Sequence, residues 1–140
     1  MIPIESSAGA VIFLKKNDTY HFLLLHYDEG HWDLVKGHIE EGETLKETVI
    51  REAKEETGID DLKFIPGFQE KTEYYFQLKG KRTFKTNKLF LAETKKEEIN
   101  LSSEHTSFAW LSYHQALEKV TFENTKKVLK KAMKFLKSKE

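Results

Sequence analysis

Apolar runs separated by short polar turns fill the first two thirds of the chain. Five segments have the length and pattern typical of strands: residues 7–14, 20–27, 62–78, 83–94 and 108–111. The Asn17-Asp18 pair marks a turn between the first two strands, and residues 79–82 mark a turn between the next two. The pattern therefore predicts two hairpins.

Two other segments repeat apolar residues at the spacing of a helix. Leu45, Val49 and Ala53 form a stripe within residues 44–57, which Gly58 is expected to end. A second helix is predicted over residues 122–137, with one apolar face made by Leu129, Ala132, Met133 and Leu136. Strands that do not alternate regularly with helices favour an α+β or sandwich arrangement, and we expect one domain over residues 1–140.

The composition excludes several classes of site and partner. Apolar residues make up 39% of the 140 residues, enough for one core, and 23 basic residues balance 23 acidic ones. A net charge of zero gives no bulk attraction to nucleic acid or membrane, so neither partner is expected. The chain has no cysteine, which excludes disulfides, thiolate metal sites and a cysteine nucleophile. The first apolar run is too short to span a bilayer, and we expect a cytoplasmic protein.

Three carboxylates gather on one face of the first predicted helix. Glu52, Glu55 and Glu56 follow the i, i+3, i+4 spacing, so they repel one another and favour a divalent cation, Mg²⁺ or Mn²⁺. Arg51 is four residues from both Glu47 and Glu55, and we expect this triplet to orient Glu55. A solvated charged helix is the alternative. The preceding loop, with Gly37 and Gly42, favours the metal site because it can bring backbone carbonyls close to a cation.

The segment from Gly37 to Ile59 resembles the signature box of the Nudix hydrolases. It reads Gly-x₅-Glu-x₇-Arg-Glu-Ala-x-Glu-Glu-x-Gly-Ile, with every fixed position filled. The resemblance implies a mixed sheet sandwiched between helices and the hydrolysis of a nucleoside diphosphate linked to another group. It also implies the roles of the box residues: metal ligation by Glu52, Glu56 and the Gly37 carbonyl, a ligand or base at Glu55, and support of the loop by Arg51 and Glu43.

Segments outside the box resemble the asymmetric diadenosine tetraphosphate hydrolases within this family. The run from Trp32 to His38 is similar to their Trp-x-x-Pro-Lys-Gly-His segment, although Val35 stands where proline is usual. The resemblance implies that Lys36 and His38 bind substrate phosphate. Ser103-Glu104-His105 resembles a second acidic motif, which implies that Glu104 is an extra metal ligand or the general base.

Aromatic and basic residues complete the resemblance to that subfamily. It implies adenine stacking by Tyr27, Phe76 and Phe122, and phosphate binding by Lys81 near the second hairpin turn. Alternation along a strand predicts that Tyr74 and Phe76 share one face and that Tyr75 lies on the other. Because aromatic residues in strands usually belong to the core, a purely structural role is the alternative for at least one of them.

The resemblance implies a small-molecule nucleotide substrate. We predict that the enzyme splits diadenosine tetraphosphate into ATP and AMP, as a monomer or a weak homodimer. One alternative is a Nudix pyrophosphatase acting on nucleoside triphosphates, including oxidised ones, or on the 5′ end of RNA. The other is a nucleotide-binding domain without activity, which the intact set of box glutamates disfavours.

Overall fold

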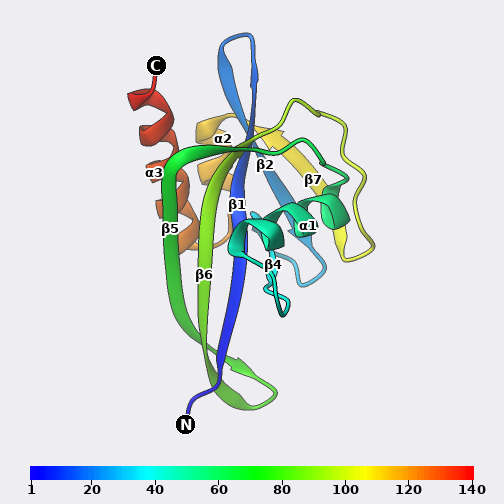
Figure 1. Cartoon of the computed structure of the whole chain (residues 1–140), viewed down its shortest axis with the longest axis vertical. Coiled ribbons are helices and arrows are strands. Elements are labelled where there is room, and N and C mark those ends of the chain that lie inside the picture. The colour runs from blue at the N-terminus through cyan, green and yellow to red at the C-terminus, as the bar shows by residue number, and fades with distance from the viewer.

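The structure, a computed structural model, describes all 140 residues. Seven strands form one sheet in the order β3-β2-β1-β6-β5, with β4 paired to β1 and β7 paired to β2. The strands are β1 (Ile4–Lys16), β2 (Thr19–Tyr27), β3 (Trp32–Asp33), β4 (Val35–His38), β5 (Lys63–Leu78), β6 (Lys81–Glu93) and β7 (His105–Leu111). The helices are α1 (Leu45–Thr57), α2 (Tyr113–Lys119) and α3 (Glu123–Ser138) (Figure 1).

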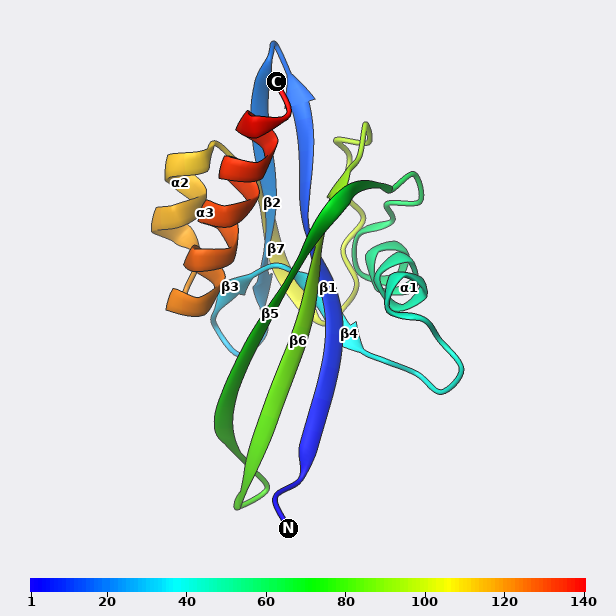
Figure 2. The same cartoon turned by 60° about the vertical axis from the view of Figure 1, so that its left-hand side comes forward.

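Helices cover both faces of the sheet. Figure 2 shows α1 on one side of the strands and α2 and α3 on the other. The β1–β6 pair is parallel and the remaining pairs are antiparallel. The predicted α+β arrangement, a mixed sheet sandwiched between helices, is confirmed.

Alternate residues of β1 point into two separate cores. Val11 and Phe13 belong to the core beneath α2 and α3, whereas Ala10 and Ile12 belong to the core beneath α1. This period of two explains why the middle of β1 is apolar at every position: both faces of the strand are covered.

Strand β1 changes its antiparallel partner half-way along. Residues 13–16 pair with β2, while residues 7–10 pair with β4, and β6 runs parallel along the other side of β1 from Ile4 to Phe13. The short strand β4 therefore enters the sheet next to the central strand. This position brings the residues around Gly37 beside α1.

The structure corrects three details of the sequence prediction. Helix α2 was not predicted, because its seven residues are too few to establish a helical period, although Ser112 and Gln115 form a capping box at its start. The second hairpin turn has two residues, Lys79 and Gly80, both with positive φ, so β6 begins at Lys81. Strand β1 begins at Ile4, because its first residues pair with β6.

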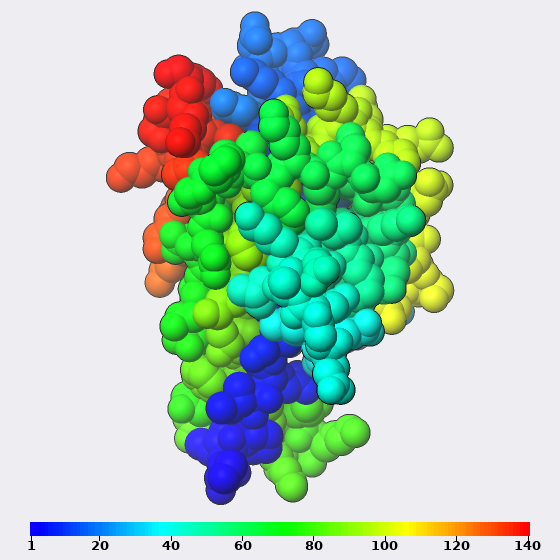
Figure 3. All heavy atoms as spheres, in the orientation of Figure 1, coloured from blue at the N-terminus to red at the C-terminus, as the bar shows by residue number.

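The hairpin end of the sheet extends beyond the helices. Figure 3 shows α1 and the loop before it over the middle of one face, with the N-terminus and the β5–β6 turn projecting below them. None of the three helices is long and apolar enough to cross a membrane.

Candidate active site

Helix α1 begins with a complete capping box. The Thr44 hydroxyl accepts a hydrogen bond from the Glu47 backbone N–H at 3.1 Å, and the Glu47 carboxylate accepts one from the Thr44 N–H at 2.8 Å. The expected triplet of Glu47, Arg51 and Glu55 is therefore wrong in one member. Glu47 is used by the cap, and only Glu55 of the two pairs with Arg51.

Arg51 joins the loop before α1 to the carboxylates of the helix. Its Nε lies 2.6 Å from Glu43 Oε2, and its Nη2 donates to the His38 carbonyl at 2.9 Å. Its Nη1 lies 2.8 Å from Glu52 and 3.4 Å from Glu55. The hydrogen bond from Arg51, supported by the Glu40 backbone, lowers the pKa of Glu43 to about 2. This network fixes the loop against the first turns of α1.

Glu56 is the buried member of the acidic face. Only 5% of the residue is exposed, and burial, together with the neighbouring Glu52 carboxylate, raises the pKa of Glu56 well above its ordinary value. Its Oε1 has no hydrogen-bond partner and lies 3.6 Å from His105 Nε2, which is also buried without a partner. A Cβ at residue 37 would overlap the Glu52 carboxylate, so glycine is required for this close approach.

These residues have the chemistry of a divalent-cation site. An unpartnered buried carboxylate oxygen, a second carboxylate beside it and an adjacent glycine backbone are hard oxygen donors of the kind that Mg²⁺ prefers. No three acidic or histidine side chains converge as closely as the ligands of one ion do. Arg51 accounts for this spacing, because its guanidinium contacts both Glu52 and Glu55.

The two candidate general bases lie at the edge of this cluster. The Glu55 side chain is 61% exposed and has a single ion pair, with Arg51. Glu104 lies in the exposed turn before β7, where its backbone carbonyl accepts a long hydrogen bond from Asp28 N–H at 3.4 Å. The Glu104 charge helps to raise the pKa of Glu56, behind burial and Glu52, so Glu104 lies within electrostatic reach of the buried carboxylate.

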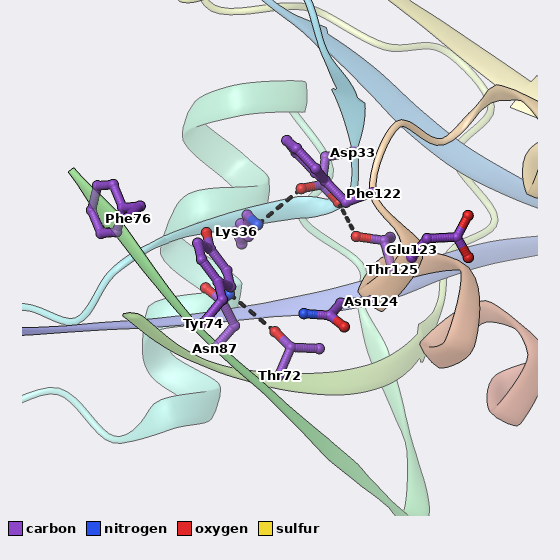
Figure 4. A pocket seen from close by; sticks show the side chains of 10 residues that line it. All are labelled: Asp33, Lys36, Thr72, Tyr74, Phe76, Asn87, Phe122, Glu123, Asn124 and Thr125. Atoms are coloured by element: carbon purple, nitrogen blue, oxygen red, sulfur yellow. Dashed lines mark hydrogen bonds and ion pairs between the residues drawn. The ribbon is translucent and has the colours of Figure 1, made fainter. Parts of the chain in front are cut away.

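A cavity of about 440 Å³ lies between the sheet and the start of α3 (Figure 4). It is lined by Asp33, Lys36, Thr72, Tyr74, Phe76, Asn87, Phe122, Glu123, Asn124 and Thr125. Tyr74 and Phe76 share the cavity face of β5, whereas Tyr75 packs on Phe84 on the opposite face, as alternation predicted. Aromatic walls and a few polar groups give the mixed lining typical of a small-molecule site.

The polar groups of this cavity were mostly missed by sequence reasoning. Lys36 Nζ pairs with Asp33 at 2.9 Å, and the Asn87 amide donates to Thr72 while its Oδ1 is buried without a partner. Lys85 lies on the same face of β6 as Asn87, donates to Ser7 Oγ at 2.7 Å and has its pKa lowered mainly by burial. Lys36 was predicted to bind substrate, whereas Asp33, Thr72 and Asn87 look like ordinary strand polar residues in the sequence. For Asn87, only the alternating pattern of β6 could have indicated its face.

Three predicted substrate-binding residues do not line the cavity. The Tyr27 hydroxyl donates to the Leu34 carbonyl at 2.5 Å, and the Tyr27 ring stacks on His31. The ring centroids of His31 and Phe122 are 5.3 Å apart. His38 is exposed and lies 3.8 Å from Glu5. Lys81 is exposed at the start of β6. Lys36, Phe76 and Phe122 are the predicted substrate-binding residues that the cavity brings together.

Comparison with known proteins decides the family. A family model described as NUDIX domain matches residues 4–132, most of the chain. The chain belongs to the Nudix hydrolase family. The predicted family, enzyme class and fold are thereby confirmed, and the acidic cluster on α1 lies within the Nudix box from Gly37 to Ile59.

Relatives of this Nudix hydrolase cover almost its whole length. The asymmetrical bis(5′-nucleosyl)-tetraphosphatase of Mus musculus is 36% identical over 142 residues, covering 93% of this chain and 94% of the relative. The crystal structure of a C. elegans Ap4A hydrolase binary complex matches with a TM-score of 0.84 and 30% identity, covering 96% of this chain and 98% of the other. An RNA pyrophosphohydrolase of Nitratiruptor is 33% identical, covering 76% of this chain and 74% of the relative.

Proposed function

We propose that this Nudix hydrolase cleaves dinucleoside polyphosphates, and diadenosine tetraphosphate in particular, into ATP and AMP. The observation that carries the proposal is a cavity lined by both Lys36 and the rings of Tyr74, Phe76 and Phe122. Lys36 directly precedes the Nudix box in the sequence. The likeness to asymmetrical tetraphosphatases over nearly the full length supports the same substrate class.

Each part of the cavity suits one part of such a substrate. A terminal adenine can stack on the exposed aromatic rings, a contact worth about 1–3 kcal/mol per base. Lys36 offers a point charge to a phosphate oxygen. The unpartnered Oδ1 of Asn87 can accept a hydrogen bond from the bound nucleotide. Because the base is held at one end, one internal phosphorus lies at the acidic cluster. Cleavage therefore occurs at a fixed number of phosphates from the bound base.

The reaction needs a water nucleophile and a neutralised polyphosphate. Glu52, Glu56 and the Gly37 carbonyl would hold Mg²⁺ or Mn²⁺, with Glu55 and Glu104 alongside, and the bound ion would supply neutralisation of the phosphate charge and a more acidic water molecule. Glu55 accepts a proton from the attacking water as the water oxygen bonds to phosphorus. The bridging P–O bond breaks, and the departing phosphate keeps the bonding electrons. Arg51 orients Glu55 and Glu52 throughout.

Product analysis tests the function directly. Diadenosine tetraphosphate, incubated with the protein and Mg²⁺, should give ATP and AMP on chromatography, with little ADP. Two ADP as the main product, or a clear preference for a nucleoside triphosphate or a 5′-triphosphate RNA in the same panel, would overturn the substrate assignment. The likeness to an RNA pyrophosphohydrolase makes that RNA the most informative competitor.

The choice of base is tested by paired variants. Glu55→Gln should lower kcat far more than it lowers metal affinity, and it should flatten the acidic limb of the pH–rate profile. Glu104→Gln should cause the smaller loss of kcat. If the Glu104 variant lost the rate while the Glu55 variant kept it, the two roles would be exchanged.

A further inference from the structure

Asp33 is a buried carboxylate on the wall of the cavity. It is 1% exposed, and its two carboxylate oxygens accept hydrogen bonds from three different residues. Its Oδ2 accepts from Lys36 Nζ at 2.9 Å, and its Oδ1 accepts from the Leu34 N–H at 2.8 Å and the Thr125 hydroxyl at 3.0 Å. Figure 4 shows Lys36 and Thr125 on different sides of Asp33, each joined to it by a dashed line.

We propose that Asp33 is a positioning residue that holds the Lys36 ammonium in the orientation in which it contacts the substrate phosphate. The proposal rests on the function proposed above. Asp33 lies outside the Nudix box, at a variable position of the Trp-x-x-Pro-Lys-Gly-His segment.

The geometry supports this role because it leaves Lys36 free to act. An ammonium has three N–H donors, and the bond to Asp33 uses one, so two remain for phosphate oxygens. The Lys36 side chain is 21% exposed, and this exposed part belongs to the cavity wall. Both Asp33 oxygens are occupied by donors, which fixes the carboxylate and, through it, a side chain that would otherwise rotate about four bonds.

A purely structural role explains the geometry less well. Asp33 also joins β3 to α3 through Thr125, but β3 is already joined to the loop just before α3 by two other hydrogen bonds. The Trp32 N–H donates to the Thr121 hydroxyl at 2.9 Å, and the Thr121 N–H donates to the Trp32 carbonyl at 3.1 Å. A neutral residue at position 33 could fill the remaining space. The charge is needed only opposite Lys36.

Asp33→Asn is the test variant, because the amide oxygen can still accept from Leu34 and Thr125 while the negative charge opposite Lys36 is lost. With diadenosine tetraphosphate as substrate, kcat should fall by about tenfold to a hundredfold, the loss expected when a reacting contact is misplaced. KM should stay the same or fall, because the cavity for a polyanion has lost a negative charge. Thr121→Val is the matched control, which breaks a hydrogen bond between β3 and the loop just before α3 and should leave kcat unchanged.

A double-mutant cycle with Lys36→Met isolates the coupling. If Asp33 acts through Lys36, Asp33→Asn should have no further effect on kcat in the Lys36→Met background. An equal loss of kcat in both backgrounds, or an equal loss in Thr121→Val, would overturn the proposal and leave Asp33 with a structural role only.

A binding measurement separates this proposal from the substrate assignment. ATP affinity in the presence of Mg²⁺ is measured by calorimetry for the wild type and the same four variants, whether or not diadenosine tetraphosphate is cleaved. If the changes in ATP binding free energy caused by Asp33→Asn and Lys36→Met are non-additive in the double variant, they support the positioning role, even if the preferred substrate proves to be another nucleotide. Additive changes overturn it even if ATP and AMP are the products.

Discussion

At the scale of single residues, the two faces of strand β5 place aromatic rings in different surroundings. Phe76 lines the cavity, whereas Tyr75, one residue earlier, packs on Phe84 with the Arg82 guanidinium 4.1 Å from its ring centroid. Two aromatic side chains at adjacent positions therefore meet two different environments. This difference provides an internal control for aromatic stacking on the substrate.

Phe76→Ala should raise KM for diadenosine tetraphosphate about tenfold or more while kcat changes little. The reason is that stacking of the base is the same in the ground state and in the transition state. Tyr75→Ala, which removes a ring of similar size from the opposite face, should leave KM unchanged. Steady-state kinetics on both variants decide the matter, and an equal rise in KM for both would show that the strand, not the ring, is responsible.

At the scale of elements, the start of α1 is held by polar contacts and its middle by burial. The capping box of Thr44 and Glu47 and the Arg51–Glu43 pair fix the first two turns, while Val49 and Ala53 are fully buried against the sheet. The helix is thereby rigid enough to hold Glu52 and Glu56 close together in spite of their repulsion.

The Arg51–Glu43 pair should make stability depend on pH in the acidic range. The folded pKa of Glu43, about 2, lies below its ordinary value of 4.5, so its contribution is present above pH 4.5 and is lost as pH falls toward 2. Glu43→Gln should therefore lower Tm at pH 7, and the gap to the wild type should close between pH 4.5 and 2. Glu41→Gln, in the same loop and without an ion pair, should show no such gap. A gap that stays constant with pH would contradict the role of the pair.

Cation binding to α1 should be measurable without turnover. Adding Mg²⁺ after treatment with a chelator should raise the Tm of the wild type, because a ligand that binds only the folded state stabilises it. Glu56→Gln replaces a buried carboxyl group, whose pKa burial and Glu52 raise well above its ordinary value, with a neutral amide of similar size. Its Tm without added metal should therefore equal or exceed that of the wild type, and Mg²⁺ should raise it much less. A full Mg²⁺ response in this variant would show that Glu56 is not a ligand.

At the scale of the whole molecule, the site exists because the sheet and α1 meet at one glycine. Strand β4 is inserted beside β1, so Gly37 lies directly against the Glu52 carboxylate. On the other side of the sheet, Phe122, the N-cap residue of α3, lines the cavity. Two adjacent residues of β4 therefore connect the two parts of the site: Gly37 lies against the acidic cluster, and Lys36 lines the cavity.

Gly37→Ala tests this contact. The added methyl would overlap the end of the Glu52 side chain, which can rotate away from residue 37, so the loss of stability should be small and the main effect a weaker Mg²⁺ response. Glu52→Ala, which removes that carboxylate altogether, should weaken the Mg²⁺ response at least as much. Chemical denaturation and thermal shifts with Mg²⁺ measure both. A Gly37→Ala variant that kept the full Mg²⁺ response would show that the close approach at residue 37 is not part of the cation site.

The sequence by itself determined the elements and the chemistry of the acidic helix. Helix α1 with its end at Gly58 and the two hairpins follow from local apolar periods and turn residues, and the resemblance to the Nudix box identifies the carboxylates of α1 and implies the mixed sheet. These features are local, since each depends on residues within a few positions of one another.

Only the tertiary structure decided which distant residues meet. Asp33 reaches Thr125 across 92 positions of sequence, and Lys85 reaches Ser7 across 78, contacts that no local pattern encodes. In the structure, the Tyr27 ring stacks on His31 and Lys81 is exposed at the start of β6, so neither residue lines the cavity. Sheet register and helix packing, not residue type, determine which side chains share a cavity.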